Sequence, residues 1–165
     1  MANSITKSCF TLPITEEQAY FAINVIDCAE HQSINFNKPY KTATSFVNCR
    51  TDVFKLAKKL VMSVGGYVQG EVRLGFEYVY IGGSFRIYHN ETINLTNAAQ
   101  FVHIILKHFE SDEFVLINAA ETCNIPVVGK FGGNAAFVTK KEVKWMSTHN
   151  WLQTQANRHN AKLTK

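Results

Sequence analysis

The stretch of residues 114–151 constrains the fold of this chain more than any other part of its sequence. Its first nine residues are apolar and then small, which is typical of a strand that another element or a ligand approaches closely. Pro126 then ends the strand, because proline cannot donate to a sheet ladder. The glycines that give the following bend access to positive φ are Gly129, Gly132 and Gly133. The sequence therefore predicts a strand that ends in a constrained Gly/Pro bend.

After this bend the pattern predicts a hairpin and a last helix. Residues 134–139 and 142–146 are short strand-like segments joined by a tight turn at Lys140-Lys141. Ser147 or Thr148 is placed to cap a helix that carries Trp151. The polar tail from residue 153 to residue 165 is expected to fray.

Three amphipathic helices are predicted in the rest of the chain, each from apolar residues at helical spacing. Thr15 begins the first, and Gln18 three residues later completes a capping box. The second is capped by Thr51 or Asp52 and ends at Gly65-Gly66, and the third is capped by Asn94 or Thr96.

The remaining strands follow from alternating polarity. Residues 4–12 predict a first strand, and residues 67–90 alternate with period two around a hairpin turn at Gly82-Gly83. Gly75 indicates a bulge or a close approach of backbone. Residues 31–50 predict a long loop with a short strand near residues 44–49, and either a functional loop or a mobile surface excursion fits this stretch.

These elements predict one α+β domain over residues 1–165. Its antiparallel sheet has five or six strands, with about three amphipathic helices packed mainly on one face. The content of 46% hydrophobic against 18% charged residues provides ample material for a core. No apolar run is long enough to span a bilayer and no signal peptide is evident, so we expect a cytoplasmic protein without membrane contact.

Charge and metal-ligand patterns exclude several function classes. The net charge of +4 comes from 17 basic and 13 acidic residues that are interleaved, so nucleic-acid binding is disfavoured. The cysteines have no C-x-x-C spacing and the six histidines have no ligand spacing, so we expect free thiols, no metal and no cofactor. The cysteines are Cys9, Cys28, Cys49 and Cys123.

The candidate ligand-binding residues surround the Gly/Pro bend and the tryptophans. They are Glu121, Thr122, Lys130, Phe131, Gly132, Gly133, Asn134, Trp145 and Trp151. Aromatic side chains hold planar ligands or anchor partner proteins, and backbone N–H groups beside glycines favour anions. Two structural alternatives stand beside this hypothesis: a bend with no ligand, and tryptophans that seal the end of the core.

Enzymatic and nucleic-acid alternatives are weaker. Cys123 with His149 is a candidate nucleophile and base, and Glu121 with Glu142 is a candidate carboxylate pair. No family-type catalytic motif surrounds these residues. Six lysines are candidates for weak nucleic-acid binding: Lys55, Lys58, Lys59, Lys140, Lys141 and Lys144.

The last third of the chain resembles a C-terminal signature of small uncharacterised α+β proteins of bacteria, phages and plasmids. The matching residues are Glu121-Thr122-Cys123, Pro126, Gly129, Phe131-Gly132-Gly133, Ala135, Val138-Thr139, Trp145-Met146, Thr148 and Trp151. The resemblance implies an accessory protein of a phage or mobile element, a class that includes factors against host defences, and it implies no catalytic residue. We therefore expect a non-enzymatic binding module that engages a host protein or a small anionic, nucleotide-like ligand, and we consider a homo-oligomer compatible with it.

Overall fold

The computed structural model describes residues 3–45, 47–65, 72–125 and 130–163, with side chains up to His159. It confirms the α+β class and the antiparallel pairing of the strands. The predictions made for Gly66, for residues 67–71, for Pro126 and for Gly129 concern residues outside these ranges.

The described strands form two antiparallel sheets. The four-stranded sheet has the order β1-β5-β6-β7, with β1 at Ser4–Lys7, β5 at Val115–Cys123, β6 at Gly132–Val138 and β7 at Val143–Ser147. The three-stranded sheet has the order β2-β4-β3, with β2 at Cys9–Leu12, β3 at Glu77–Ile81 and β4 at Ser84–Tyr88.

The difference from a single sheet of five or six strands arises at Ser8. This residue separates β1, which pairs with β5, from β2, which pairs with β4. The Ser8 hydroxyl donates to the Asn118 carbonyl oxygen at 2.7 Å, where the ladder of β1 ends. If β1 and β2 are counted as one bent strand, the described order becomes β3-β4-(β2-β1)-β5-β6-β7, which has the predicted number of six strands.

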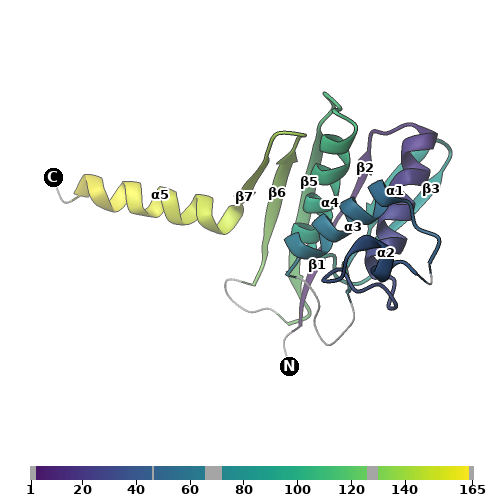
Figure 1. Cartoon of the computed structure of the whole chain (residues 1–165). Helices are drawn as coiled ribbons and strands as arrows, with labels where there is room; N and C mark the ends of the chain where they lie inside the picture. The colour runs from purple at the N-terminus through teal and green to yellow at the C-terminus, as the bar shows by residue number, and fades with distance from the viewer. Residues whose placement is uncertain (1–2, 46, 66–71, 126–129, 164–165) are drawn as a thin grey trace.

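The three predicted helices lie together on one side of the sheets (Figure 1). They are α1 (Glu16–Glu30), α3 (Thr51–Ser63) and α4 (Leu95–His108). The Thr15 capping box and the Asn94 cap are confirmed, and each side chain accepts a backbone N–H three residues later. The prediction for α3 is wrong by one or two residues, because Arg50 is the N-cap and the Asp52 carboxylate accepts from Val53 N–H at 2.9 Å.

The loop of residues 31–50 is anchored to the core, and this contradicts a mobile surface excursion. Phe36 is fully buried and its ring stacks on that of Phe54, with centroids 5.2 Å apart. The predicted strand near residues 44–49 is absent from the described part of this loop, which instead contains the short helix α2 (Tyr40–Ala43). The Tyr40 hydroxyl donates to the Cys49 carbonyl and ties α2 to the end of the loop.

The β3–β4 hairpin turns at Gly82-Gly83 as predicted, with φ values of 58° and 73°. The alternating pattern that continues back to Val72 does not form a strand before Glu77. Gly75 explains this, because its φ of 70° turns the chain and its carbonyl oxygen accepts from Asn94 N–H at 2.7 Å. The predicted close approach at Gly75 is therefore confirmed.

The last helix, α5 (Thr148–Leu163), extends well into the segment that was expected to fray. The Ser147 hydroxyl accepts from Asn150 N–H at 3.2 Å, which supports the predicted cap. Beyond its first turns α5 runs away from both sheets (Figure 1). Over the residues described, no helix combines the length and the apolar character that crossing a bilayer requires.

Candidate functional site

The four-stranded sheet has one covered face and one open face. Along β5, Val115, Ile117 and Ala119 are buried, whereas Leu116 and Asn118 between them are exposed. Alternate residues of a strand point to opposite faces, so the helices cover only the first set. We call the second set the outer face; it comprises Leu116, Asn118 and Ala120 of β5, Gly133, Ala135 and Phe137 of β6, and Lys144 and Met146 of β7, with Phe114 beside them.

Large apolar side chains gather on the outer face. Leu116 and Met146 are each 58% exposed, Phe114 is 52% exposed and Phe137 is 37% exposed. The register places Leu116 opposite Phe137, and the rings of Phe114 and Phe137 lie 5.5 Å apart. A contiguous exposed apolar patch on a regular sheet is typical of a surface that another molecule covers.

Small residues form a shallow floor between these bulky side chains. Two adjoining hollows, of about 290 and 580 Å³, share Asn118, Ala135 and Met146. The larger one continues over Ala120 and Gly133 toward Lys7 and Thr148. The prediction that the small run of β5 admits a close approach is consistent with this shape.

Several of the candidate residues around the Gly/Pro bend lie close together where β6 begins. The Asn134 amide donates to the Glu121 carboxylate, and Gly133 N–H donates to the Thr148 hydroxyl at 3.0 Å. The expectation of positive φ at Gly132 and Gly133 is wrong, because both lie within β6 and neither has a positive φ. A Cβ at Gly132 would lie 3.0 Å from the Thr148 hydroxyl at the start of α5, and one at Gly133 would lie 3.1 Å from the Ala119 carbonyl oxygen of β5.

The other bend residues lie apart from the two hollows. Thr122 is exposed opposite Ile5, and Lys130 and Phe131 are exposed just before β6. None of the three lines either outer-face hollow.

The two tryptophans line one hollow at the start of α5. Trp145 is 46% exposed and Trp151 is 55% exposed, so the alternative in which they seal the core is wrong. Both line a hollow of about 290 Å³ together with Arg158. Met146 lines this hollow and the two on the outer face, so the tryptophan pair lies next to the apolar patch.

The geometry does not support the predicted catalytic pairs. The Cys123 thiol donates to Asn124 Oδ1 at 3.9 Å, whereas His149 is exposed in the first turn of α5 and makes no described contact with it. Glu121 pairs with Gly132 at one end of β6, and Glu142 lies beyond its other end. A strand of this length separates the two carboxylates by roughly 20 Å.

The six candidate lysines for nucleic-acid binding do not form one basic surface. Lys140 lies 2.8 Å from Asp112, and this hydrogen bond raises the pKa of Lys140 and lowers that of Asp112. Lys144 lies 2.8 Å from Glu142. Lys141 is exposed in the turn after Lys140. The other three, Lys55, Lys58 and Lys59, belong to α3 on the helical side of the molecule.

A second site, which the sequence analysis missed, lies where α1 ends and α3 begins. The sulfur atoms of Cys28 and Cys49 are 3.3 Å apart beside a hollow of about 320 Å³ that His31 and Arg50 also line. Burial, and then the hydrogen bond with the Cys49 thiol, raises the pKa of Cys28 well above its ordinary value. The two cysteines are 21 residues apart without a recognisable spacing, so no sequence signal indicated their proximity.

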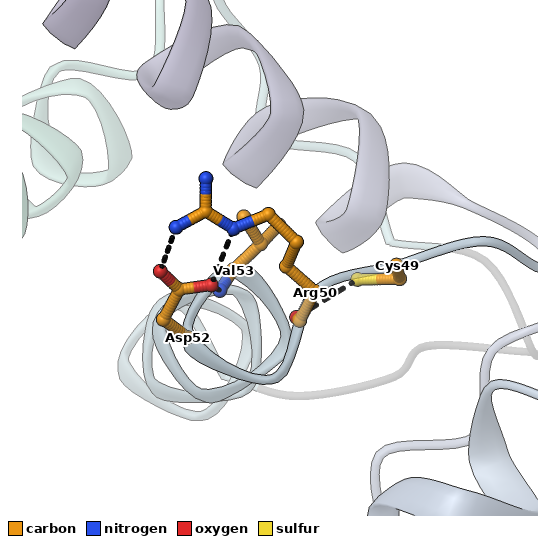
Figure 2. Close-up of polar contacts among 4 residues, drawn as sticks. All are labelled: Cys49, Arg50, Asp52 and Val53. Atoms are coloured by element: carbon orange, nitrogen blue, oxygen red, sulfur yellow. Dashed lines mark hydrogen bonds and ion pairs between the residues drawn. The ribbon is translucent and has the colours of Figure 1, made fainter.

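Hydrogen bonds fix the start of α3 next to this thiol pair (Figure 2). The Arg50 guanidinium holds the Asp52 carboxylate through two hydrogen bonds of 3.2 and 2.6 Å, and the Cys49 thiol donates to the Arg50 carbonyl oxygen at 3.5 Å. Partial burial raises the pKa of Asp52, but the hydrogen bonds from Arg50 and from Val53 N–H outweigh it and lower that pKa overall.

We predict that glutathione disulfide oxidises Cys28 and Cys49 to a disulfide, with release of two glutathione thiols. Sulfur atoms at 3.3 Å need to move by only about 1 Å to bond. Closing this loop is expected to raise the free energy of unfolding by about 3 kcal/mol. Peptide mapping without reduction and urea unfolding measure both effects, and Cys9→Ser is the control that keeps the disulfide. Glutathione adducts on Cys28 or Cys49 without a link between them would contradict the prediction.

Comparison of the chain with protein-family models, with curated proteins and with solved structures found no match. The resemblance of the C-terminal third therefore stays a prediction.

Proposed function

We propose that this chain is a non-enzymatic binding module that engages a protein through the outer face of its four-stranded sheet. The observation that carries the proposal is the group of four large apolar side chains exposed on one rigid face: Phe114, Leu116, Phe137 and Met146. Antiparallel pairing on both sides holds β5 and β6 in place, so this surface is formed before any partner arrives.

The shape of the face favours a helical segment of the partner. The floor of the two hollows has short side chains or none, at Asn118, Ala120, Gly133 and Ala135, and longer side chains border it. Small residues let an amphipathic helix seat its apolar stripe between the larger side chains.

A small anionic ligand is the less favoured partner. The larger hollow has one charged lining residue, Lys7, and its ammonium group already donates to the Asn90 carbonyl. Binding of a nucleotide-like molecule needs several convergent donors. The origin in a mobile element and the role against host defences remain predictions from the resemblance alone.

The experiment compares two double variants with equal changes in charge. Leu116→Glu with Met146→Glu places carboxylates on the outer face, and Met62→Glu with Ile81→Glu places them on side chains of similar exposure elsewhere. Proteins captured from a lysate are identified by mass spectrometry, purified and titrated against each variant. We expect the outer-face variant to bind at least about tenfold more weakly and the control to bind as the wild type does. Equal affinity of both variants for every captured protein would refute the proposal.

A further inference from the structure

The position of helix α5 suits the binding of a second partner, separate from the one at the outer face. It projects from the molecule beyond β7 (Figure 1), and its side chains from Thr148 to Thr154 and from Ala156 to His159 are exposed. A helix of 16 residues is marginal in water without tertiary packing. Apart from Trp151 and Leu152, the exposed side chains of α5 are polar or small. The partner of α5 is therefore expected to be hydrophilic.

The distribution of charge indicates the sign of that partner. Lys144 is paired with Glu142 at 2.8 Å. Residues 148–165 contain three basic residues, Arg158, Lys162 and Lys165, and no Asp or Glu. The first 147 residues hold 14 basic and 13 acidic residues, so three of the four excess positive charges lie in α5 and in the end of the chain. A projecting, acid-free segment on a nearly neutral body favours a polyanion.

The side chains of α5 suit base edges as well as phosphates. Asn150, Gln153 and Asn157 follow one another at spacings of three and four residues, so they share one face of the helix. The Gln153 amide donates to Asn157 Oδ1 at 3.1 Å, which orders two of the three. Asn and Gln amides match the donor and acceptor edges of adenine, whereas an exposed cation on the helix reaches phosphates or guanine.

The root of the helix offers donors to the backbone of a nucleic acid. The hollow of about 290 Å³ that Trp145 and Trp151 line also contains Arg158. Indole N–H groups and a guanidinium are donors that bind phosphate oxygens. A nucleic-acid strand whose phosphates lie in this hollow would place α5 in the groove next to that strand.

We infer that α5 is a DNA-binding helix that enters the major groove of a duplex, with the amides of Asn150, Gln153 and Asn157 toward the bases and Arg158 toward the backbone. The major groove of B-form DNA admits an α-helix, whereas that of A-form RNA is too narrow. The 16 residues of α5 span about 24 Å, enough to cross the groove. This surface differs from the outer face, so the two proposals stand or fall separately.

The test is fluorescence anisotropy of a labelled, mixed-sequence DNA duplex titrated with the full chain at several NaCl concentrations. We expect saturable binding at low salt that weakens as salt rises. Arg158→Ala should weaken binding about tenfold and reduce the slope of log affinity against log salt by about one. Arg86→Ala removes the same charge from an exposed position on β4 and should change affinity by less than about twofold.

A triple variant, Asn150→Ala with Gln153→Ala and Asn157→Ala, separates base contacts from charge. It should weaken binding while the salt slope stays unchanged, because no cation is lost. Three results would overturn the inference: no saturable binding at low salt, equal losses for Arg158→Ala and Arg86→Ala, or equal affinity for a duplex of RNA. Circular dichroism confirms that each variant is folded, and the exposed positions of these residues make loss of the fold an unexpected result.

Discussion

Replacing Phe101 with alanine is expected to lower the free energy of unfolding by about 3–5 kcal/mol. Phe101 lies in the middle of α4 and is fully buried. Its ring lies 5.5 Å from that of Phe76 and 6.3 Å from that of Phe85 in β4. These neighbours belong to different elements, so they cannot close the space together and a cavity remains. A loss of this size is a large part of the stability of an ordinary domain.

Urea denaturation followed by circular dichroism measures the loss, and Phe114→Ala is the matched control. Phe114 is 52% exposed beside the outer face, so the same change there is expected to cost less than about 1 kcal/mol. Similar losses for the two variants would mean that α4 does not form the centre of the core.

Replacing Gly75 with alanine is expected to cost about 2–3 kcal/mol. Its φ of 70° is unfavourable for any residue with a Cβ, which accounts for about 1–2 kcal/mol. A Cβ there would also lie 2.9 Å from the Cβ of Asn94. Because Asn94 is the N-cap of α4, moving it weakens the hydrogen bond to Asn97 N–H and adds about 1 kcal/mol.

The control for this second prediction is Gly83→Ala in the β3–β4 hairpin. Gly83 has nearly the same φ, 73°, but a Cβ there meets no atom within 4 Å. We therefore expect this variant to lose only the backbone term of about 1–2 kcal/mol. Thermal unfolding of the two variants gives the difference, and equal losses would show that Asn94 adjusts without cost.

Local signals in the sequence were sufficient for most of the secondary structure. The apolar stripes located α1, α3 and α4, because each helix buries one face in the core. The caps at Thr15 and Asn94 and the turn at Gly82-Gly83 depend on residues close in sequence, and all three were predicted correctly.

Features that depend on distant parts of the chain were not predictable. Nothing in residues 4–12 shows that β1 and β2 pair with different strands, because the partners β5 and β4 lie far away in sequence. For the same reason, the sequence did not indicate the contact between Cys28 and Cys49. Gly132 and Gly133 suggested a bend, whereas close approach of the Thr148 side chain at Gly132 and of the Ala119 carbonyl oxygen at Gly133 explains why glycine lies there.

The candidate site was predicted in part. The sequence left open whether Trp145 and Trp151 are exposed or seal the end of the core, and the structure exposes both. The small residues of β5 indicated a close approach, which the hollow above them fits. The apolar outer face was missed, because a run such as residues 114–117 is also typical of a strand covered on both sides. The binding role that we propose for α5 had no local signal, because the polar composition of this helix resembles a fraying tail.

The most direct test of the central claim is hydroxyl-radical footprinting of the chain alone and in complex with its captured protein. The proposal predicts that labelling of Leu116, Phe137 and Met146 falls on binding, whereas Met62 and Ile81, which are comparably exposed in the free chain, keep their labelling. Unchanged labelling of the outer face, together with protection of another surface, would contradict the claim that this sheet face is where the protein binds.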